Sequence, residues 1–524
     1  MIRILVADRI AEDGLARLRA AGDTEVDVRL GLGVEELAAV IGEYDGVIIR
    51  SGVRVTPEVL AKPGRLRVIA RAGVGVDNVA LGAASASGVL VMNTPDANTV
   101  STAEHALAMM LALFRRIPQA HAHVAAGEWD RKAFVGRQVA GKTLGIVGFG
   151  RVGRAVAERA LALGMEVLAC DPFLRRETAL DGRVRVIREL DALLPEVDCL
   201  TLHAALTDET RHLIDAARLK RLKKTAVLIN CARGALVDER ALADALSAGT
   251  IAGAAIDVYA AEPPKDSPLL GCQNVVLTPH LGASTVEAQT SVSTDAVEAV
   301  LDYLRDGLIR NAVNVTDLPA DLTPHDRAAL DLVGRMAAML SIWCGDGIDR
   351  VEVAVGDGDA LAALCPTLAL QAVVEMMSPH IDGRLNLVNA AAFARQRGID
   401  VRHAVHSLTH DLPGVVQVRC ERRGETHTIE GAVFSDRRPR VLAVDGYRME
   451  MVPEGRLVLV FNDDRPGVIG LVGTLFGDRE LNVADLFLSR REKTALMVLK
   501  SDDRIPDAVV DELRRAPPIL SVHT

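Results

Sequence analysis

The first 310 or so residues of this 524-residue chain alternate short β-branched runs with helical stretches rich in alanine, leucine and arginine. This alternation is typical of strands joined by crossover helices, which build parallel sheets covered on both faces. Ligands of such sheets bind outside the carboxyl ends of the strands, so we expect functional residues there. The strands that we predict are residues 3–7, 46–49, 66–70, 143–147, 166–169, 199–203, 226–230, 253–258 and 275–278.

The length predicts several domains, at roughly 150 residues per domain. A helical stretch over residues 94–112 follows Pro95, which places a boundary between two α/β units near that residue. Residues 317–326 contain proline and aspartate and predict a linker, after which the sequence has a less regular α+β character. From Pro453 onward the expected order is strand, helix, strand, strand, helix, strand, which is the order of a ferredoxin-like module.

The composition is that of an ordinary globular protein, with 49% apolar and 25% charged residues. A net charge of −10 argues against nucleic acid or anionic lipid as the main partner. No apolar run reaches the length of a membrane span, and the first residues lack the regions of a signal peptide, so we expect a cytoplasmic protein. Its seven cysteines are dispersed without C-x-x-C spacing, which predicts reduced thiols, no disulfide framework and no metal site.

Residues 148–153 read Gly-Phe-Gly-Arg-Val-Gly, the pattern of dinucleotide-binding loops. With 43 glycines in the chain, roughly 0.3 such matches are expected by chance, so the context decides. An apolar run over 143–147 precedes the loop, and a helical run over 154–163 follows it. Glycines let a pyrophosphate approach the backbone, and the helix N-terminus attracts the anion. We therefore predict a dinucleotide site, with a glycine-rich turn that binds no ligand as the alternative.

Two acidic residues at predicted strand ends suit the same cofactor. Asp171 lies 18 residues past the last glycine of the loop, where a carboxylate accepts hydrogen bonds from the adenosine ribose. Because that carboxylate repels a 2′-phosphate, it favours NAD over NADP. Asp257 follows another predicted strand and can accept a hydrogen bond from a nicotinamide carboxamide.

Arg233, Glu262 and His280 each follow a predicted strand. Taken singly, each reads as an exposed loop residue or a structural histidine. Together they suit the oxidation of an alcohol, because a histidine can take the hydroxyl proton near neutral pH. Glu262 would orient the imidazole and stabilise its protonated form. Arg233 can hold a substrate carboxylate by a two-point bond and polarise a carbonyl in the reverse direction.

Residues 148–153, 230–238, 254–263 and 279–284 resemble the signature blocks of the D-isomer-specific 2-hydroxyacid dehydrogenases. The resemblance extends from the first residue to about residue 314. In that family the matching arginine, glutamate and histidine are catalytic, which implies these roles for Arg233, Glu262 and His280. The residues that the loop pattern and the resemblance together assign to NAD are Gly148, Gly150, Arg151, Val152, Gly153, Asp171, Thr207, Cys231 and Asp257.

The resemblance also implies an architecture. A discontinuous, flavodoxin-like substrate-binding domain of residues 1–95 and 281–313 would close over a Rossmann-like NAD-binding domain of residues 96–280. Arg50, Ser51 and Arg71 follow two predicted strands and suit a phosphate and a carboxylate. Residues 129–132 resemble the segment that a partner subunit contributes near the substrate, which implies a homodimer or a homotetramer.

Within the family, the length and the C-terminal modules resemble the long-form branch, whose members oxidise 3-phospho-D-glycerate to 3-phosphohydroxypyruvate in the first step of L-serine biosynthesis. Residues 315–452 resemble its intervening domain. That stretch contains four arginines that suit either an anion site or a charged surface: Arg397, Arg437, Arg438 and Arg440.

Residues 453–524 resemble an ACT regulatory domain, a module that binds amino acids between paired copies. Asn462, Asp464 and Asn482 match its effector-contacting positions, which implies L-serine as a candidate effector. We expect these three residues to lie together at the ends of two adjacent strands.

Two other functions remain open at this point. The enzyme could prefer another small 2-hydroxy acid such as glycerate or lactate, although Arg50, Arg71 and the regulatory tail argue against this. A dehydrogenase-like fold can also serve as an NADH-sensing scaffold that binds protein partners, and steady turnover would exclude that function.

Overall fold

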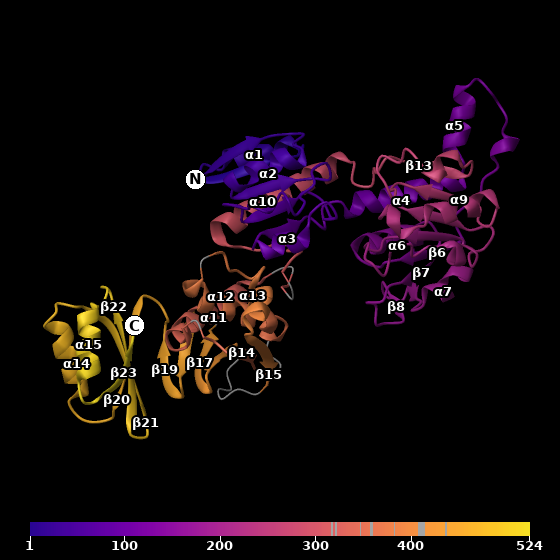
Figure 1. Cartoon of the computed structure of the whole chain (residues 1–524). Coiled ribbons are helices and arrows are strands. Elements are labelled where there is room, and N and C mark those ends of the chain that lie inside the picture. Colours follow the sequence, from indigo (N-terminus) through magenta and orange to yellow (C-terminus); the bar gives the residue numbers. More distant parts are fainter. Residues whose placement is uncertain are drawn as a thin grey trace.

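The structure is a computed structural model that describes residues 1–315, 318–319, 322–345, 347–356, 360–381, 383–406, 414–434 and 438–524. These residues form two parallel sheets near the N-terminus and two further, mainly antiparallel sheets after them (Figure 1). The predicted α/β class with two additional C-terminal α+β units is therefore confirmed. Among the described residues, none of the helices has the length and apolar character needed to span a membrane.

The outer sheet is wholly parallel and has the strand order β2-β1-β3-β4-β5, which is the flavodoxin-like order. Its last helix, α10, comes from a distant part of the sequence and buries Val297 and Val300 in the same core as Ile4 and Val68. The sheet and its helices comprise β1 (Ile2–Val6), α1 (Glu12–Ala20), β2 (Thr24–Val28), α2 (Val34–Val40), β3 (Gly46–Ile49), β4 (Val68–Arg71), α3 (Leu81–Ala86), β5 (Leu90–Asn93) and α10 (Val286–Asp306).

The second sheet has the order β13-β12-β11-β10-β6-β7-β9-β8 and is parallel except where β8 meets β9. The strand order reverses between β6 and β10, and in such sheets a dinucleotide binds at this switch point. The elements are α4 (Thr99–Phe114), α5 (Ile117–Ala125), β6 (Thr143–Val147), α6 (Arg151–Ala162), β7 (Glu166–Cys170), β8 (Thr178–Ala179), β9 (Val184–Val186), α7 (Leu190–Leu193), β10 (Cys199–Leu202), α8 (Ala216–Leu219), β11 (Val227–Asn230), α9 (Glu239–Ser247), β12 (Gly253–Ile256) and β13 (Val275–Leu277).

Two segments connect the parallel sheets: the stretch that contains α4, and residues 281–285, which lead from β13 to α10. The two segments are hydrogen-bonded to each other. Thr102 Oγ1 donates to the carbonyl of Gly282 at 3.2 Å, and the hydroxyl oxygens of Ser101 and Thr285 are 2.7 Å apart. The outer unit is thus built from two pieces of chain that enter and leave side by side. The exact domain limits remain predictions.

The third sheet has the order β15-β14-β16-β17-β18-β19, and α11 and α12 pack against it around a single apolar core. Helix α11 begins with a capping box, in which Thr323 and Asp326 bond to each other's backbone N–H groups. The elements are α11 (Pro324–Cys344), β14 (Arg350–Val355), α12 (Cys365–Met377), α13 (Ala390–Arg397), β15 (Asp400–Val405), β16 (Val415–Arg422), β17 (Glu425–Val433), β18 (Pro439–Val444) and β19 (Tyr447–Met451).

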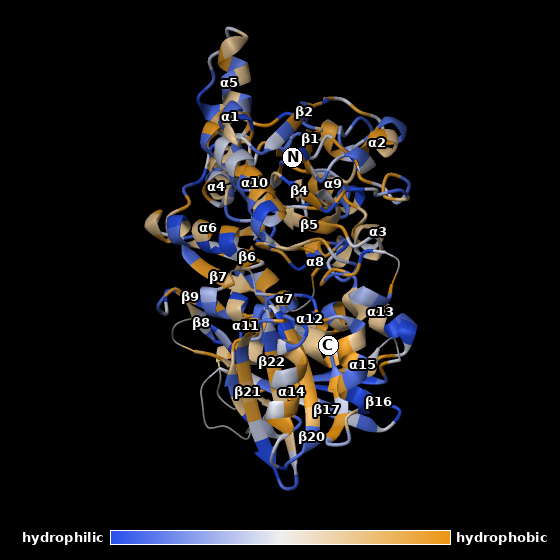
Figure 2. Cartoon of the chain, turned by 90° about the vertical axis from the view of Figure 1, so that its left-hand side faces the viewer, coloured by the Kyte–Doolittle hydropathy of each residue, from blue (hydrophilic) through white to orange (hydrophobic). Residues whose placement is uncertain are grey.

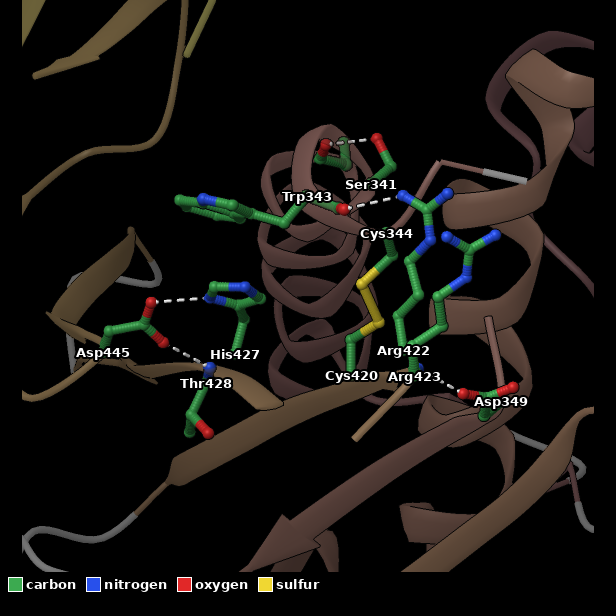
Figure 3. The surroundings of a disulfide bond; sticks show 11 residues. Ser341, Trp343, Cys344, Asp349, Cys420, Arg422, Arg423, His427, Thr428 and Asp445 are labelled. Atoms are coloured by element: carbon green, nitrogen blue, oxygen red, sulfur yellow. Dashed lines mark hydrogen bonds and ion pairs between the residues drawn. A yellow bond between two sulfur atoms is a disulfide. The ribbon is translucent and has the colours of Figure 1, made fainter. Parts of the chain in front are cut away.

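A disulfide joins Cys344, the last residue of α11, to Cys420 on β16 (Figure 3). The prediction that all seven thiols are reduced is wrong for this pair. Although 76 residues separate the two cysteines in the sequence, α11 packs directly against β16. Sequence spacing alone could not reveal that proximity. The remaining cysteines are free thiols.

The fourth sheet has the order β21-β22-β20-β23 and carries two helices, as the ferredoxin-like prediction requires. It lies at the far end of the chain from the nucleotide-type sheet (Figure 1). Its elements are β20 (Arg456–Asp463), α14 (Val468–Gly477), β21 (Val483–Arg491), β22 (Thr494–Ser501), α15 (Asp507–Arg515) and β23 (Ile519–His523).

All nine predicted strands are present, with ends that differ by no more than two residues. The predicted linker over residues 317–326 is wrong at its C-terminal end, because α11 already begins at Pro324. Strand β2 was missed because it is a partly exposed edge strand that alternates charged and apolar residues. Asp317 and Arg437 lie outside the described residues.

Candidate active site

The glycine loop connects β6 to α6 at the switch point, and each of its glycines meets a different spatial demand. Gly148 has φ +88°, and a Cβ there would lie 2.6 Å from the backbone nitrogen of Ala204. A Cβ on Gly153 would lie 2.2 Å from the Gly148 carbonyl oxygen, so helix and strand could not pack as closely. A Cβ on Gly150 would meet nothing within 4 Å, which leaves the loop open to a ligand at the helix N-terminus. This cradle fits a pyrophosphate.

Asp171 directly follows β7 and lies beside this loop. Its carboxylate accepts hydrogen bonds from the backbone N–H groups of Phe149, at 2.7 Å, and Phe173, at 2.9 Å. A carboxylate has about four acceptor positions, so two are left for ribose hydroxyls. Asp171 therefore holds the loop in shape and presents a negative charge beside it.

The other residues predicted to bind NAD differ in exposure. Arg151 is exposed and pairs with Asp96, and Thr207 lies in an exposed loop after β10. Cys231 is buried, which raises the pKa of its thiol.

Asp257 is fully buried, and its carboxylate accepts hydrogen bonds from four protein donors: Thr278 Oγ1, Leu281 N, Gly282 N and His105 Nε2. A direct bond from Asp257 to a nicotinamide carboxamide remains a prediction, and this structure does not support it.

His280 and Glu262 form a pair, as predicted. His280 Nδ1 lies 2.8 Å from Glu262 Oε2, and both side chains are about half exposed. Glu262 is itself held by the backbone N–H of Tyr259, which donates to Oε1 at 3.2 Å. His280 has φ +57°, a left-handed conformation that costs a non-glycine residue about 1 kcal/mol. The surrounding contacts must therefore hold the turn that presents the imidazole.

Arg233 follows β11 and reaches the outer unit. Its Nε donates to Asp77 Oδ2 at 2.8 Å, and Asp77 lies in the loop after β4. Its Nη1 donates to the carbonyl of Ala232 at 2.7 Å. A Cβ on Gly75 would lie only 1.8 Å from Arg233 Nη2, so the guanidinium fits there because Gly75 has no side chain. Arg233 therefore lies at the junction of the two parallel units.

Arg71 and Arg50 bring further positive charge to this junction from the ends of β4 and β3. Burial, together with the nearby guanidinium groups of Arg233 and Arg50, lowers the pKa of Arg71 to about 10, against the opposite effect of Asp77 and Asp8. Arg71 Nε is buried and has no hydrogen-bond partner among the described residues. A buried cation with an open donor and cationic neighbours favours an anionic ligand. Ser51 is exposed next to Arg50.

Comparison with known proteins gives the family. Residues 107–282 match the NAD binding domain of D-isomer specific 2-hydroxyacid dehydrogenases, and residues 327–445 match the D-3-phosphoglycerate dehydrogenase intervening domain. D-3-phosphoglycerate dehydrogenase of Methanocaldococcus jannaschii is 38% identical to this chain over 527 aligned residues, which span 100% of this chain and 99% of that relative. The chain belongs to the D-3-phosphoglycerate dehydrogenases.

Other relatives agree. D-3-phosphoglycerate dehydrogenase of Bacillus subtilis is 36% identical, over 100% of this chain and 99% of its own length. Among solved structures, a glyoxylate reductase from Paecilomyes thermophila superposes with a TM-score of 0.55 at 29% identity, over 60% of this chain and 98% of its own. D-lactate dehydrogenase from Escherichia coli superposes with a TM-score of 0.53 at 29% identity, over 60% of this chain and 100% of its own.

The candidate effector residues of this phosphoglycerate dehydrogenase do not lie together within the chain, so that prediction is wrong. Strands β20 and β21 both pair antiparallel with β22, which lies between them, and are therefore parallel to each other. Asn462 and Asp464 lie at the carboxyl end of β20, whereas Asn482 precedes β21 and bonds to Asp502 at the opposite end of the sheet. Asp464 pairs with Arg490, and the buried Oδ1 of Asn462 has no partner among the described residues.

Two of the arginines predicted in the intervening domain, Arg397 and Arg440, contact different neighbours. Arg397 lies over the ring of Phe393, and Arg440 lies over Phe434 and pairs with Glu450. These contacts are those of a charged surface.

Two residues at the active site were not predicted from the sequence. Asp77 anchors Arg233 from the outer unit, and His105 contacts Asp257 from helix α4. Neither residue directly follows a strand of the nucleotide-binding sheet. The expectation that functional residues lie at the carboxyl ends of strands therefore did not identify them. The signal in the sequence for His105 was its position as the polar first residue of the apolar run 105–114.

We expect Asp171→Ala to reduce the preference for NAD over NADP by about tenfold or more, because the variant loses both the ribose acceptor and the charge that repels a 2′-phosphate. The measurement is kcat/KM with each cofactor. Glu177→Ala, an exposed acidic position nearby, is the matched control and should leave the ratio unchanged. A wild-type enzyme that prefers NADP would contradict the assignment.

Proposed function

We propose that the residues described above carry out the NAD-dependent oxidation of 3-phospho-D-glycerate to 3-phosphohydroxypyruvate, the first step of L-serine biosynthesis. The chain is an NAD-dependent oxidoreductase of this family. Two observations carry the residue assignment: three arginines from both parallel units converge at their junction, and a histidine–glutamate pair follows the last strands of the nucleotide-type sheet. Such a site suits a substrate with two anionic groups and an alcohol between them.

His280 is proposed as the acid–base group. Its Nδ1 faces Glu262, and because a carboxylate only accepts hydrogen bonds, Nδ1 carries the proton in that contact. Nε2 is then the nitrogen that takes the proton from the substrate hydroxyl. Glu262 stabilises the imidazolium that forms. When bound, NAD would supply the acceptor for the hydride from C2 of the substrate.

Arg233 is proposed to bind the substrate carboxylate and to polarise the oxygen at C2. Its Nε and Nη1 are occupied by Asp77 and Ala232, which fix the plane of the guanidinium. The Nη2 group, which approaches Gly75, then remains for the substrate. Arg50, Ser51 and Arg71 are proposed to bind the phosphate from the outer unit, where the buried Nε of Arg71 supplies an unused donor.

A homodimer or homotetramer is part of this proposal. Helix α5 projects away from the rest of the chain (Figures 1 and 2). Ile117 and Val124 on this helix are about half exposed, and Trp129 and Val135 just after it are each 78% exposed. Several large apolar side chains on one projecting segment favour a protein interface. A second copy would cover them.

L-serine as an effector and a cytoplasmic location complete the proposal. Because Asn462 and Asp464 lie at the opposite end of the sheet from Asn482, one ligand can contact all three only if two C-terminal modules pair. Asp464 would then exchange its contact with Arg490 for the ammonium of the amino acid.

A cytoplasmic location suits the proposed substrate and cofactor, because charged molecules do not cross membranes unaided.

We expect His280→Ala and Arg233→Ala each to lower kcat/KM for 3-phosphoglycerate by at least about 100-fold, since one removes the base and the other the oxygen-polarising cation. NADH affinity, measured by fluorescence titration, should change by less than about twofold, because neither residue belongs to the glycine loop. Arg240→Ala, an exposed arginine on α9, serves as the control. Near-normal rates in either active-site variant would remove the assignment.

We expect Asp464→Ala to weaken inhibition by L-serine by about tenfold or more, with little change in the uninhibited rate. The C-terminal module lies at the far end of the molecule from β13, the strand that precedes His280 (Figure 1). Asp478→Ala, at the end of α14, is the control. Inhibition is measured as the serine concentration that halves the rate. A wild-type enzyme indifferent to millimolar serine would refute serine as the ligand and leave the module's fold unaffected.

A further inference from the structure

Asp257, at the end of β12, accepts hydrogen bonds from three consecutive backbone N–H groups of the turn that carries His280. The Asp257 carbonyl accepts from His280 N at 2.8 Å. Its carboxylate accepts from Leu281 N at 2.7 Å, from Gly282 N at 2.9 Å and from Thr278 Oγ1 at 2.6 Å. These hydrogen bonds hold the backbone at His280 and at the two residues after it. His280 is the residue in the left-handed conformation.

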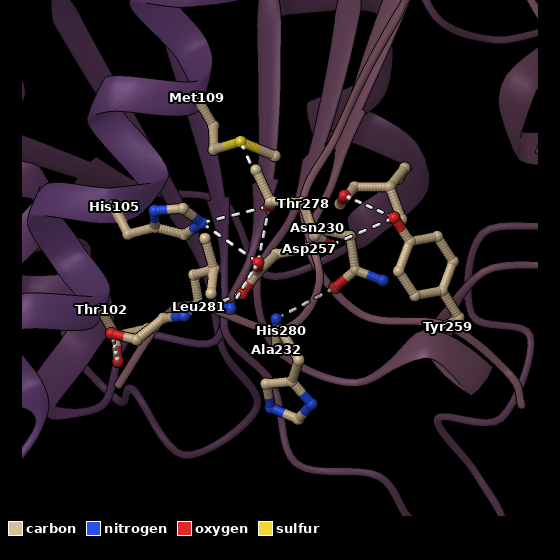
Figure 4. Close-up of polar contacts among 12 residues, drawn as sticks. Thr102, His105, Met109, Asn230, Ala232, Asp257, Tyr259, Thr278, His280 and Leu281 are labelled. Carbon is tan, nitrogen blue, oxygen red and sulfur yellow. Dashed lines mark hydrogen bonds and ion pairs between the residues drawn. The ribbon is translucent and has the colours of Figure 1, made fainter. Parts of the chain in front are cut away.

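A fully buried carboxylate needs strong donors, and one of its donors comes from outside the sheet. His105, on helix α4, places Nε2 at 3.1 Å from Asp257 Oδ1 and at 3.3 Å from Thr278 Oγ1 (Figure 4). Because the carboxylate can only accept, Nε2 must carry the proton in this contact. Hydrogen bonds from His105, Thr278 and Leu281 outweigh burial and lower the pKa of Asp257. The site thus keeps the charge that holds the turn.

A group of possible metal ligands lies beside this turn: His105, Cys231 and Asp257 bring ligand atoms within 4.8 Å of one another. Their other contacts do not favour a metal ion. The carboxylate already accepts from two backbone N–H groups and a hydroxyl, and Cys231 is buried with a raised pKa, so its thiol stays protonated. Hydrogen bonding accounts for the cluster.

The contact between His105 and Asp257 also links the turn to the connection between the two parallel units, because His105 lies on α4. Helix α4 is part of one of the two connections between the parallel sheets, and residues 281–285 are the other. Thr102 and Ser101 of α4 bond to Gly282 and Thr285, one turn of helix before His105. In Figure 4, His105 and Thr102 approach the turn from α4, while the His280 ring points away from the cluster. The turn is therefore fixed to the segment about which the two units would move.

We propose that His105 is a positioning residue for hydride transfer: through Asp257 it holds the turn that aims the His280 imidazole, and it ties that turn to the connection between the two parallel units. The inference rests on the proposed role of His280 as the acid–base group. His105 does not touch the substrate in this scheme and acts only through Asp257 and Thr278.

The test compares His105→Leu, which removes the donor, with His105→Gln, which keeps an N–H donor on a side chain of similar reach. Single-turnover oxidation of 3-phosphoglycerate is followed by NADH absorbance in the full-length enzyme. The rate constant reports how well the site is aligned, whereas the amplitude reports how many sites are active. Glu104→Gln, on the exposed side of α4, is the matched control.

We expect His105→Leu to lower the rate constant at least tenfold with an amplitude within twofold of wild type, and His105→Gln to restore it to within about threefold. The inference is overturned if the Leu variant has a wild-type rate constant, or if only its amplitude falls. It is also overturned if the Gln variant is as slow as the Leu variant. If the Leu variant does not fold, Thr278→Val removes another donor to Asp257, and the same rate criteria apply.

His280→Ala is measured in parallel to separate the two proposals. If His280→Ala turns over normally, the acid–base assignment itself fails. If His280→Ala is inactive and His105→Leu is unaffected, only the positioning role of His105 fails.

Discussion

The hydrogen bonds between the two connecting segments of the parallel sheets determine where the reacting groups can lie. Helix α4 and residues 281–285 cross from one unit to the other side by side and are joined through Thr102 and Ser101. The turn that bears His280 directly precedes one of these segments, and Arg233 bridges to Asp77 of the outer unit. A rotation of the outer unit about this crossing would change the distance from His280 to Arg50 and Arg71, which lie on the outer unit. In the proposed scheme, the arrangement of the two units therefore sets the geometry of the site.

The positive charge at the junction of the two parallel units is a second constraint on what the site can bind. The chain carries a net charge of −10, yet positive charge is concentrated at the junction of the two parallel units. Burial and the two nearby guanidinium groups of Arg233 and Arg50 together lower the pKa of Arg71 there to about 10. Placing like charges together costs stability, because each cation repels the others. A doubly anionic substrate would offset this repulsion, and this is the physical basis of the proposed selectivity for phosphorylated acids.

Local patterns in the sequence predicted the sheet strands, the glycine loop, Asp171 and the His280–Glu262 pair. The structure has these strands and brings these residues to the expected places because strand, turn and helix signals are local, and because the carboxyl ends of parallel strands meet at one edge; the roles of the residues stay predictions. Asp77, His105 and the Cys344–Cys420 disulfide were missed because each depends on a contact between distant elements. The expected grouping of Asn462 with Asn482 failed for a related reason: the pairing order β21-β22-β20 separates their ends, and sheet order is not a local property.

The most direct test is to compare initial rates of NAD reduction with 3-phospho-D-glycerate and with unphosphorylated D-glycerate. Because Arg50 and Arg71 have no anionic partner from the substrate when the phosphate is missing, kcat/KM for the phosphorylated acid should exceed that for glycerate by at least about 100-fold. Equal values for the two acids, or a preference for glycerate, would contradict the assignment of the outer arginines to a phosphate.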